Sequence, residues 1–138
     1  MKERIGLVTG GVTGIGKAIV QEMAENGITV IICDRDEERG RKMHLESGQL
    51  GANLHFKKCD VGNEEEVSSV VKEIKEEFGR LDYLVNNAGI IRRRTGPEIK
   101  TIDWDDVFRV NVRGAFLCIK YFSDLMIKQK SGKIVNIS

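Results

Sequence analysis

The chain has 138 residues, long enough for one domain with a hydrophobic core, and we expect a single domain over residues 1–138. Its 22 Lys and Arg residues nearly balance 21 Asp and Glu residues, and the two signs are interspersed, so no field attracts nucleic acid or an anionic membrane. No apolar run approaches the ~20 residues of a membrane span, and the N-terminus has no apolar signal segment. We therefore expect a cytoplasmic protein with no nucleic-acid or membrane partner.

An apolar run, Ile5–Val8, precedes a glycine-rich segment, and an amphipathic stretch, Ala18–Asn26, follows it. This order predicts a strand, a tight turn and a helix. The first N–H groups of a helix have no partner within the helix and the macrodipole is positive there, so phosphate groups are stabilised. Gly10 suits a turn that needs a positive φ. Gly14 and Gly16 lack a Cβ and leave room for a pyrophosphate and for close packing of the helix on the strand.

A second apolar run, Thr29–Cys33, ends on Asp34, about 20 residues beyond the glycine-rich segment. A carboxylate at this place accepts hydrogen bonds from a ribose diol. Strand, glycine-rich turn, helix, strand and acid in this order predict a dinucleotide site. The alternative is a glycine turn followed by an Asp that caps the next helix.

The rest of the chain continues the alternation of apolar strands and helical patterns. The expected elements are a helix over Asp36–Gly48, a strand over Leu54–Cys59, a helix capped by Asn63 and ended by Gly79, a strand over Leu81–Val85, a loop over Gly89–Lys100, a helix from Thr101 or Asp103 to Asn111, a longer helix from Asn111 to about Lys128, and a strand over Lys133–Ile137. Parallel crossovers are right-handed, so the helices must cover both faces of one sheet. The sequence predicts a doubly wound, Rossmann-like α/β domain with five parallel strands in the order 3-2-1-4-5.

The three cysteines, Cys33, Cys59 and Cys118, are odd in number, have no C-x-x-C spacing and stand in apolar segments. We expect them to be reduced and buried. His44 and His55 have no ligand spacing to each other or to a cysteine, so no metal site is expected.

Several short motifs follow one another along the chain. They are Thr9-Gly10-x-x-x-Gly14-Ile15-Gly16, Cys59-Asp60-Val61, Asn86-Asn87-Ala88-Gly89, Asn111, and Gly132 to Ser138. In this order and near this spacing, they are similar to the motifs of the short-chain dehydrogenase/reductases. The resemblance covers the whole chain and implies the NAD(P)-binding N-terminal portion of an oxidoreductase that moves hydride between nicotinamide and an alcohol or ketone.

Members of the family continue beyond the point that matches Ser138 and carry a Tyr-x-x-x-Lys motif there. The fold is therefore expected to be truncated before its last part, and the chain by itself to bind the cofactor without turnover. The alternative is a non-catalytic dinucleotide-binding fragment.

The resemblance also implies roles for individual residues. Cofactor contacts fall on Gly10, Thr13, Gly14, Ile15, Gly16, Asp34, Arg35, Asp60, Val61, Asn87, Ala88 and Gly89. Asp60 would accept from the adenine amino group, although an Asp before Gly62 is also a routine turn residue. Asn111 matches the family's catalytic asparagine, which holds a water for proton relay; the alternative is a local kink or cap. Ser138 receives no catalytic assignment.

Asp34 also bears on the choice of cofactor. Its carboxylate accepts from the ribose 2′-OH of NAD and repels the 2′-phosphate of NADP. Arg35 works against this preference, whereas Thr13 stands where NADP-using relatives often carry a basic residue and supplies no cation. We expect NAD, with NADP the less favoured cofactor.

Two further segments suggest a substrate class and a partner. Arg92, Arg93 and Arg94 resemble the loop of gluconate and deoxygluconate dehydrogenases, where arginines can bind a carboxylate; the alternative is a solvated charge run. The helix Asn111–Lys128 is apolar around more of its circumference than one buried face requires. A homo-oligomer through this helix is therefore expected.

Overall fold

The structure is a computed structural model that describes residues 3–49 and 53–138. The strands are β1 (Ile5–Thr9), β2 (Thr29–Asp34), β3 (Leu54–Lys58), β4 (Tyr83–Asn86) and β5 (Lys133–Asn136). The α-helices are α1 (Gly14–Glu25), α2 (Glu37–Gln49), α3 (Glu64–Glu77), α4 (Thr101–Phe108) and α5 (Ala115–Gln129). A 3₁₀ turn, η1 (Gly96–Glu98), precedes α4, and a π-helical segment, η2 (Arg109–Gly114), joins α4 to α5.

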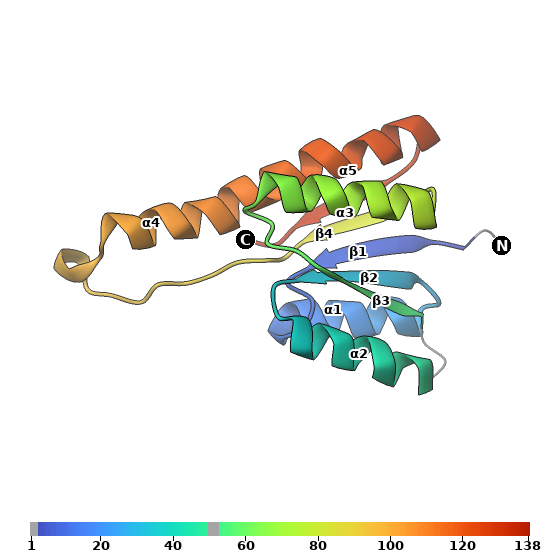
Figure 1. Cartoon of the computed structure of the whole chain (residues 1–138), viewed down its shortest axis with the longest axis horizontal. Helices are drawn as coiled ribbons and strands as arrows, with labels where there is room; N and C mark the ends of the chain where they lie inside the picture. The colour runs from blue at the N-terminus through green and yellow to red at the C-terminus, as the bar shows by residue number, and fades with distance from the viewer. Residues whose placement is uncertain (1–2, 50–52) are drawn as a thin grey trace.

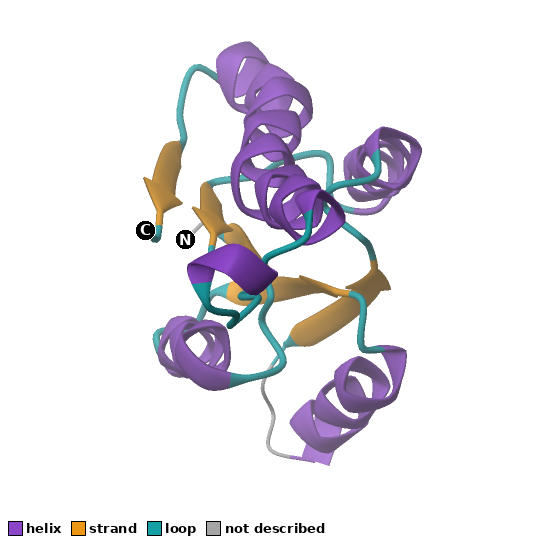
Figure 2. Cartoon of the chain, turned by 90° about the vertical axis from the view of Figure 1, so that its left-hand side faces the viewer, coloured by secondary structure: helices purple, strands orange, loops and turns teal. Residues whose placement is uncertain are grey.

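All paired strands are parallel, and their order is β3-β2-β1-β4-β5, which confirms the predicted doubly wound sheet. Helices α1 and α2 lie on one side of the sheet and α3 and α5 on the other (Figure 1). Figure 2, turned by 90°, shows the same two layers with the strands between them. The strand order reverses between β1 and β4, and ligands of open α/β sheets bind at the carboxyl end of such a switch point.

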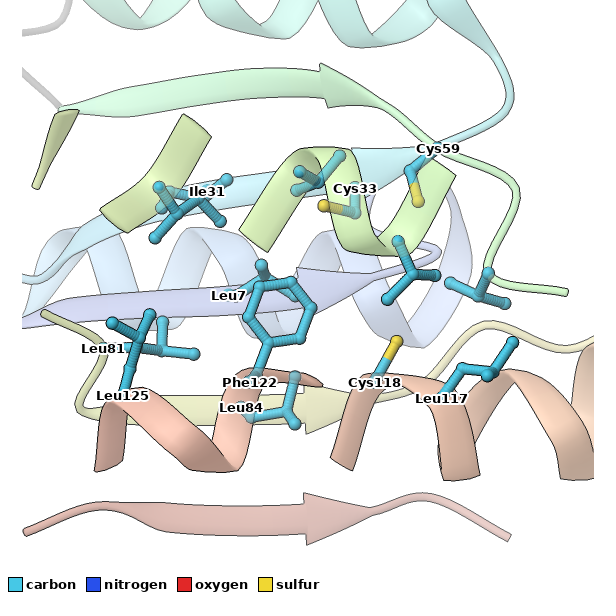
Figure 3. Close-up of a cluster of buried hydrophobic side chains, with 14 of the residues drawn as sticks. Leu7, Ile31, Cys33, Cys59, Leu81, Leu84, Leu117, Cys118, Phe122 and Leu125 are labelled. Carbon is cyan, nitrogen blue, oxygen red and sulfur yellow. The ribbon is translucent and has the colours of Figure 1, made fainter. Parts of the chain in front are cut away.

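The central strands are buried because helices cover both their faces. Every residue of β1 is buried, as is every residue of β2 except Asp34, which explains their nearly continuous apolar sequences. In Figure 3, Phe122 and Leu125 of α5 point toward the strands, in the neighbourhood of Leu7 and Leu84. Packing of α5 against these strands fixes the position of the segment that precedes it.

Local signals set both ends of α3. As predicted, Asn63 caps α3, because its Oδ1 accepts from the N–H groups of Glu65 (3.0 Å) and Glu66 (3.2 Å). Gly79, with a φ of 68°, follows the end of that helix. Helix α1 differs from its prediction, since it begins at Gly14 rather than Ala18. Gly14 and Gly16 therefore belong to the first helical turn, and the N–H groups of that turn lie at the open end of the helix.

The boundary between two helices that we predicted at Asn111 does not change the direction of the chain. Helices α4 and α5 continue one another through the π-helical segment η2, whose flanking residues keep helical φ and ψ values. In Figure 1 the resulting rod extends α4 well past the carboxyl ends of the strands. A π-helical turn accommodates an extra residue without ending the helix, so the predicted boundary at Asn111 becomes a local widening.

The three cysteines are free and buried, as predicted. Burial raises the pKa of Cys59 and of Cys118 to about 12, and that of Cys33 well above its usual value. Residues 3–49 and 53–138 contain no cluster of side chains that could hold a metal ion. No helix in the described part of the chain is long and apolar enough to span a bilayer.

Candidate functional site

A cavity of about 340 Å³ opens at the carboxyl ends of β1, β2, β3 and β4, at the switch point of the sheet. Its lining residues are Gly10, Thr13, Gly14, Ile15, Cys33, Asp34, Arg35, Cys59, Asp60, Val61, Asn87, Ala88, Gly89, Ile90 and Val110. The lining includes every residue predicted to contact a cofactor except Gly16. The motifs that are scattered along the sequence therefore meet in one hollow.

The glycine-rich segment is shaped by two close approaches. Gly10 has a φ of 65°, and a Cβ on it would lie 2.9 Å from Cα of Ala88. A Cβ on Gly16 would overlap the carbonyl of Gly10, so Gly16 is required for packing beneath the cavity rather than in its wall. Gly14 has a φ of 54° and open space where a Cβ would stand. The first turn of α1 thus presents its N–H groups to the cavity without side-chain cover.

Asn87 joins the end of β4 to this segment. Its Nδ2 donates to the carbonyl oxygens of Thr9 and Gly10, at 3.1 Å in each case. In return, the hydroxyl of Thr9 accepts from the backbone N–H groups of Asn87 and Ala88, both at 3.0 Å. These four bonds hold the two sides of the switch point together and define the shape of the cavity between them.

Asp34 is half-buried at the end of β2, and its carboxylate accepts hydrogen bonds from nearby backbone N–H groups. Its Oδ1 accepts from the N–H of Asp36 at 3.0 Å, and its Oδ2 accepts from the N–H of Val12 at 3.4 Å. Both contacts leave lone pairs on a carboxylate, which has about four acceptor sites. Arg35 beside it is exposed, so a carboxylate and a guanidinium share this part of the cavity.

The carboxylate of Asp60 has two partners within the protein. Its Oδ1 accepts from the N–H of Gly62 at 2.9 Å, which is the turn interaction considered as its alternative role. Its Oδ2 accepts from Nη1 of Arg109 at 2.8 Å. Arg109 comes from η2 and had no predicted role, because nothing in the sequence pairs it with a residue 49 positions earlier.

Asn111 does not line the cavity. Its side-chain amide instead holds Ile90, which does: the N–H of Ile90 donates to Oδ1 at 2.8 Å, and Nδ2 donates to the carbonyl of Ile90 at 3.0 Å. Asn111 therefore fixes the start of the loop that leaves the cavity. We call residues 89–100 the arginine loop.

The arginine loop carries one paired and two exposed guanidinium groups. Arg92 donates to Oδ2 of Asp106 at 2.7 Å and lies 3.8 Å from a carboxylate oxygen of Asp103. Arg92, the first arginine of the charge run, is therefore paired with carboxylates of the protein. Arg93 and Arg94 are exposed and form no salt bridge with the described residues.

Four lining residues were not predicted: Cys33, Cys59, Ile90 and Val110. Cys33 is the last residue but one of β2, and Cys59 directly follows β3. Each stands one position before a predicted Asp, so the strand ends indicated them. Ile90 directly follows Gly89 and was equally accessible to sequence reasoning. Val110 is different, because only the π-helical segment brings it to the cavity.

Known proteins resemble the whole chain. The family described as short chain dehydrogenase matches residues 4–138. An uncharacterized oxidoreductase of Thermotoga maritima is 38% identical over 138 residues, covering 100% of this chain and 54% of that protein. A 3beta-hydroxysteroid dehydrogenase of Mediterraneibacter gnavus is 39% identical over 137 residues, covering 99% of this chain and 49% of that protein.

A solved structure shares the fold as well. The gluconate 5-dehydrogenase of Burkholderia cenocepacia, in complex with NADP and tartrate, is 32% identical with a TM-score of 0.90, covering 99% of this chain and 53% of that one. Its cofactor is NADP and does not support our expected preference for NAD. The chain spans about half the length of the curated relatives that it matches. With a family match over residues 4–138, the chain belongs to the short-chain dehydrogenase family.

Proposed function

We propose that this chain binds a nicotinamide adenine dinucleotide across the carboxyl edge of its sheet, as the cofactor-binding part of an oxidoreductase acting on alcohols or ketones. The observation that carries the proposal is the meeting of an uncovered helix N-terminus, Asp34 and Asp60 in one cavity. An adenosine diphosphate group needs an anion site, a ribose acceptor and an adenine acceptor, and these residues supply them.

The residues of the cavity fit such a ligand sterically. The space above Gly14 is open, and the side chain that Gly10 lacks would have filled the approach to Ala88. Ile15 is exposed at the rim, where it offers an apolar surface. In this arrangement the first turn of α1 would hold the pyrophosphate, Asp34 would bind the adenosine ribose, and Asp60 and Val61 would bind the adenine.

The choice between NAD and NADP depends on two opposed groups. The carboxylate of Asp34 favours NAD, because it would repel a 2′-phosphate. Arg35 lines the same cavity, and the similar gluconate 5-dehydrogenase holds NADP, which favours the phosphorylated cofactor. We propose that Asp34 sets the ratio, so that Asp34→Asn raises the affinity for NADP relative to NAD. Isothermal calorimetry with both cofactors measures that ratio, and an unchanged ratio would reject the assignment.

The bound cofactor supplies hydride chemistry, and the protein must supply a proton donor. No tyrosine or lysine lines the cavity in the described part of the chain. The side chain of Asn111 is engaged with Ile90, so we propose that Asn111 acts on the proton path through backbone position rather than through its amide. Consequently, the 138-residue chain is expected to bind dinucleotide without turnover.

The decisive experiment is calorimetric titration of the chain with NAD and NADP, followed by an assay with a panel of alcohols and sugar acids. Binding without turnover is the expected result. A positioned general acid contributes about 10²–10⁴-fold to rate, so turnover like that of a complete relative would contradict the proposal. Absence of any dinucleotide binding would reject the cofactor site itself.

A sugar acid is the substrate class that we propose for the complete enzyme. The support is the exposed pair Arg93 and Arg94 in the loop that leaves the cavity, together with similarity to a gluconate 5-dehydrogenase. In an enzyme containing this chain, replacing both arginines with glutamine should raise KM for an acidic sugar and leave KM for a neutral polyol unchanged. Equal effects on both substrates would reject the carboxylate interpretation.

We further propose that the chain assembles with a second copy through α4, η2 and α5. Four large apolar side chains follow one another at four-residue spacing along this rod and are exposed: Trp104, Phe108, Val112 and Phe116. Side chains at this spacing share one face of a helix, so they form a continuous apolar stripe. A self-complementary stripe of this kind is suited to a twofold interface.

A further inference from the structure

We propose that Asp60, Arg109, Asp106 and Arg92 form an ion-pair chain through which the adenine end of the cavity and the arginine loop influence each other. Arg109 is the positioning residue at its centre. The inference rests on the proposed dinucleotide site, because only an adenine nucleotide in the cavity would contact Asp60.

The first link joins the cavity wall to η2. Nη1 of Arg109 donates to Oδ2 of Asp60 at 2.8 Å, while Oδ1 of Asp60 is occupied by the N–H of Gly62. A Cβ on Gly62 would overlap the guanidinium of Arg109, so glycine at this position allows the arginine to reach the carboxylate. An adenine amino group that approaches Asp60 would use a remaining lone pair of a carboxylate whose charge already attracts Arg109.

The second link divides one carboxylate between two arginines. Oδ1 of Asp106 accepts from Nε (3.2 Å) and Nη2 (3.0 Å) of Arg109, and Oδ2 accepts from Nη2 of Arg92 at 2.7 Å. The guanidinium of Arg109 holds the pKa of Asp106 below its usual value, in keeping with close contact. Both arginines compete for the same negative charge.

Three of the four side chains in these links are partly buried, and Arg92 is the most exposed of the four. The side chains are 23% (Asp60), 33% (Arg109), 27% (Asp106) and 37% (Arg92) exposed. Water and salt therefore screen them incompletely. Positive and negative side chains alternate in this series of ion pairs. Weakening one ion pair therefore strengthens the adjacent pair, and that in turn weakens the pair after it.

This alternation gives a signature that a loss of folding stability would not produce. When Arg92 is removed, Asp106 attracts Arg109 more strongly, and Asp60 becomes more available to a ligand. When Asp106 loses its charge, Arg109 depends on Asp60 alone, and Asp60 becomes less available. Neighbouring members of the chain should thus change nucleotide affinity in opposite directions, whereas structural damage would weaken binding in both cases.

The first experiment measures the affinity of the 138-residue chain for AMP, which has the adenosine end of the dinucleotide and lacks the nicotinamide half. Arg92→Gln should tighten binding and Asp106→Asn should weaken it, each by about two- to fivefold, the range of partly screened ion pairs. Both effects should disappear in the Arg109→Met background. Changes in the same direction, or changes that persist without Arg109, would overturn the proposal.

Arg113 provides a matched control. It also comes from η2 and also contacts the loop after β3, donating to the carbonyl of Gly62 at 3.0 Å and lying 3.5 Å from Glu64. None of its contacts is to Asp60 or Asp106. Arg113→Met should leave the effects of Arg92→Gln and Asp106→Asn intact, and their loss in that background would mean that any disturbance of η2 suffices.

A second measurement needs no ligand and keeps the inference separate from the proposed function. Trypsin cleaves after Arg93 and Arg94, and the rate of that cleavage reports how firmly Arg92 holds the arginine loop. Asp60→Asn should speed cleavage severalfold, because Arg109 then draws Asp106 away from Arg92, whereas Arg109→Met should slow it. If the wild-type chain binds no nucleotide, the proposed function fails, and these two opposite rates still decide whether the ion-pair chain exists.

Discussion

Asn111 and Ile90 are joined by two hydrogen bonds of opposite sense, each residue donating to the other. The N–H and the carbonyl of Ile90 are therefore both hydrogen-bonded, as they would be in a β-sheet. Because this bond pair lies at the start of the arginine loop, it fixes the direction in which the loop leaves the cavity.

Asn111→Asp should loosen that loop. The substitution keeps the acceptor for the N–H of Ile90 but replaces the donor with a second acceptor that faces a carbonyl oxygen. We expect a loss of about 1–2 kcal/mol in the free energy of unfolding and faster tryptic cleavage after Arg93. The control is Asn26→Asp, which removes a similar amide bond to the carbonyl of Glu22 (2.8 Å) far from the loop; faster loop cleavage in that variant would contradict the explanation.

Gly16→Ala should abolish nucleotide binding and lower stability. Its Cβ would overlap the carbonyl of Gly10, so the first turn of α1 must move away from β1. Overpacking of this kind costs about 1–3 kcal/mol. Gly48→Ala in α2 is the matched control, because a Cβ there meets open space and alanine is the better helix former by about 1 kcal/mol. Urea denaturation and AMP calorimetry on both variants test the contrast, and equal stability changes would refute it.

Local patterns predicted the strands and the glycine-rich segment because their causes are local. A run of apolar residues needs burial on both faces, and a glycine with positive φ follows from turn geometry at Gly10. The same reasoning identified Asn63 as a cap. These features depend on neighbours within a few residues of the chain.

The partners of Arg109 and Arg92 were not predictable in this way. Arg109 reaches Asp60 only because a π-helical turn rotates η2 toward the loop after β3. Arg92 contacts Asp106 only because α4 extends back along the arginine loop. Both contacts depend on the tertiary position of α4. The sequence therefore could not show that Arg92, the first arginine of the charge run, is paired within the protein.

Asp82 should give the fold a measurable acid sensitivity. Burial alone raises its pKa, but hydrogen bonds from the guanidinium of Arg80 and the N–H of Ile5 (2.9 Å) lower it more, and the pKa stays below its usual value. A depressed pKa contributes stability above the unfolded value of about 3.9, and that stability is lost as the pH falls through the folded value. Asp82→Asn should therefore cost about 2 kcal/mol at pH 7 and progressively less below about pH 4.

Denaturation by urea at several pH values tests this expectation. Asp124→Asn is the control, since Asp124 pairs with Lys128 on an exposed helix surface where such pairs contribute about 0.3–0.5 kcal/mol. A cost for Asp82→Asn that does not diminish in acid would show that its charge is not the cause. Because Asp82 lies at the amino end of the sheet, AMP affinity should be unaffected.

The buried thiols should destabilise the fold in alkali. A raised pKa means that the folded protein retains protons that the unfolded chain releases, so stability is complete below the unfolded thiol pKa of about 8.5 and falls as the pH rises toward 12. Between about pH 9 and pH 11, a range that lies between the unfolded and folded pKa values of the thiol, the stability of Cys118→Val should fall less steeply than that of the wild type. The same burial predicts slow reaction with a thiol reagent in buffer and rapid reaction of all three cysteines in guanidinium; parallel alkaline slopes would contradict the assignment.

Phe116→Glu should prevent self-association of the chain. The side chain of Phe116 is 59% exposed at the C-terminal end of the apolar stripe, and a carboxylate there would be desolvated in the proposed interface. Leu45→Glu on α2 is the control, because Leu45 is 70% exposed and lies outside the stripe. Analytical ultracentrifugation should show wild type and Leu45→Glu as oligomers and Phe116→Glu as a monomer. A monomeric wild type at high concentration would contradict the proposed assembly.

The free energy of local opening differs between the strands of the sheet, and β5 is expected to open more easily than β1 and β2. All of its residues are exposed, and among residues 3–49 and 53–138 it pairs with β4 alone, whereas β1 and β2 have strands on both sides and buried side chains. Separating β5 breaks one ladder and buries little apolar area, so the free energy of that opening is a small part of the global value. Amide hydrogens should exchange first in β5 and last in β1 and β2. Within the described part of the sheet, β5 is consequently the strand that separates most easily.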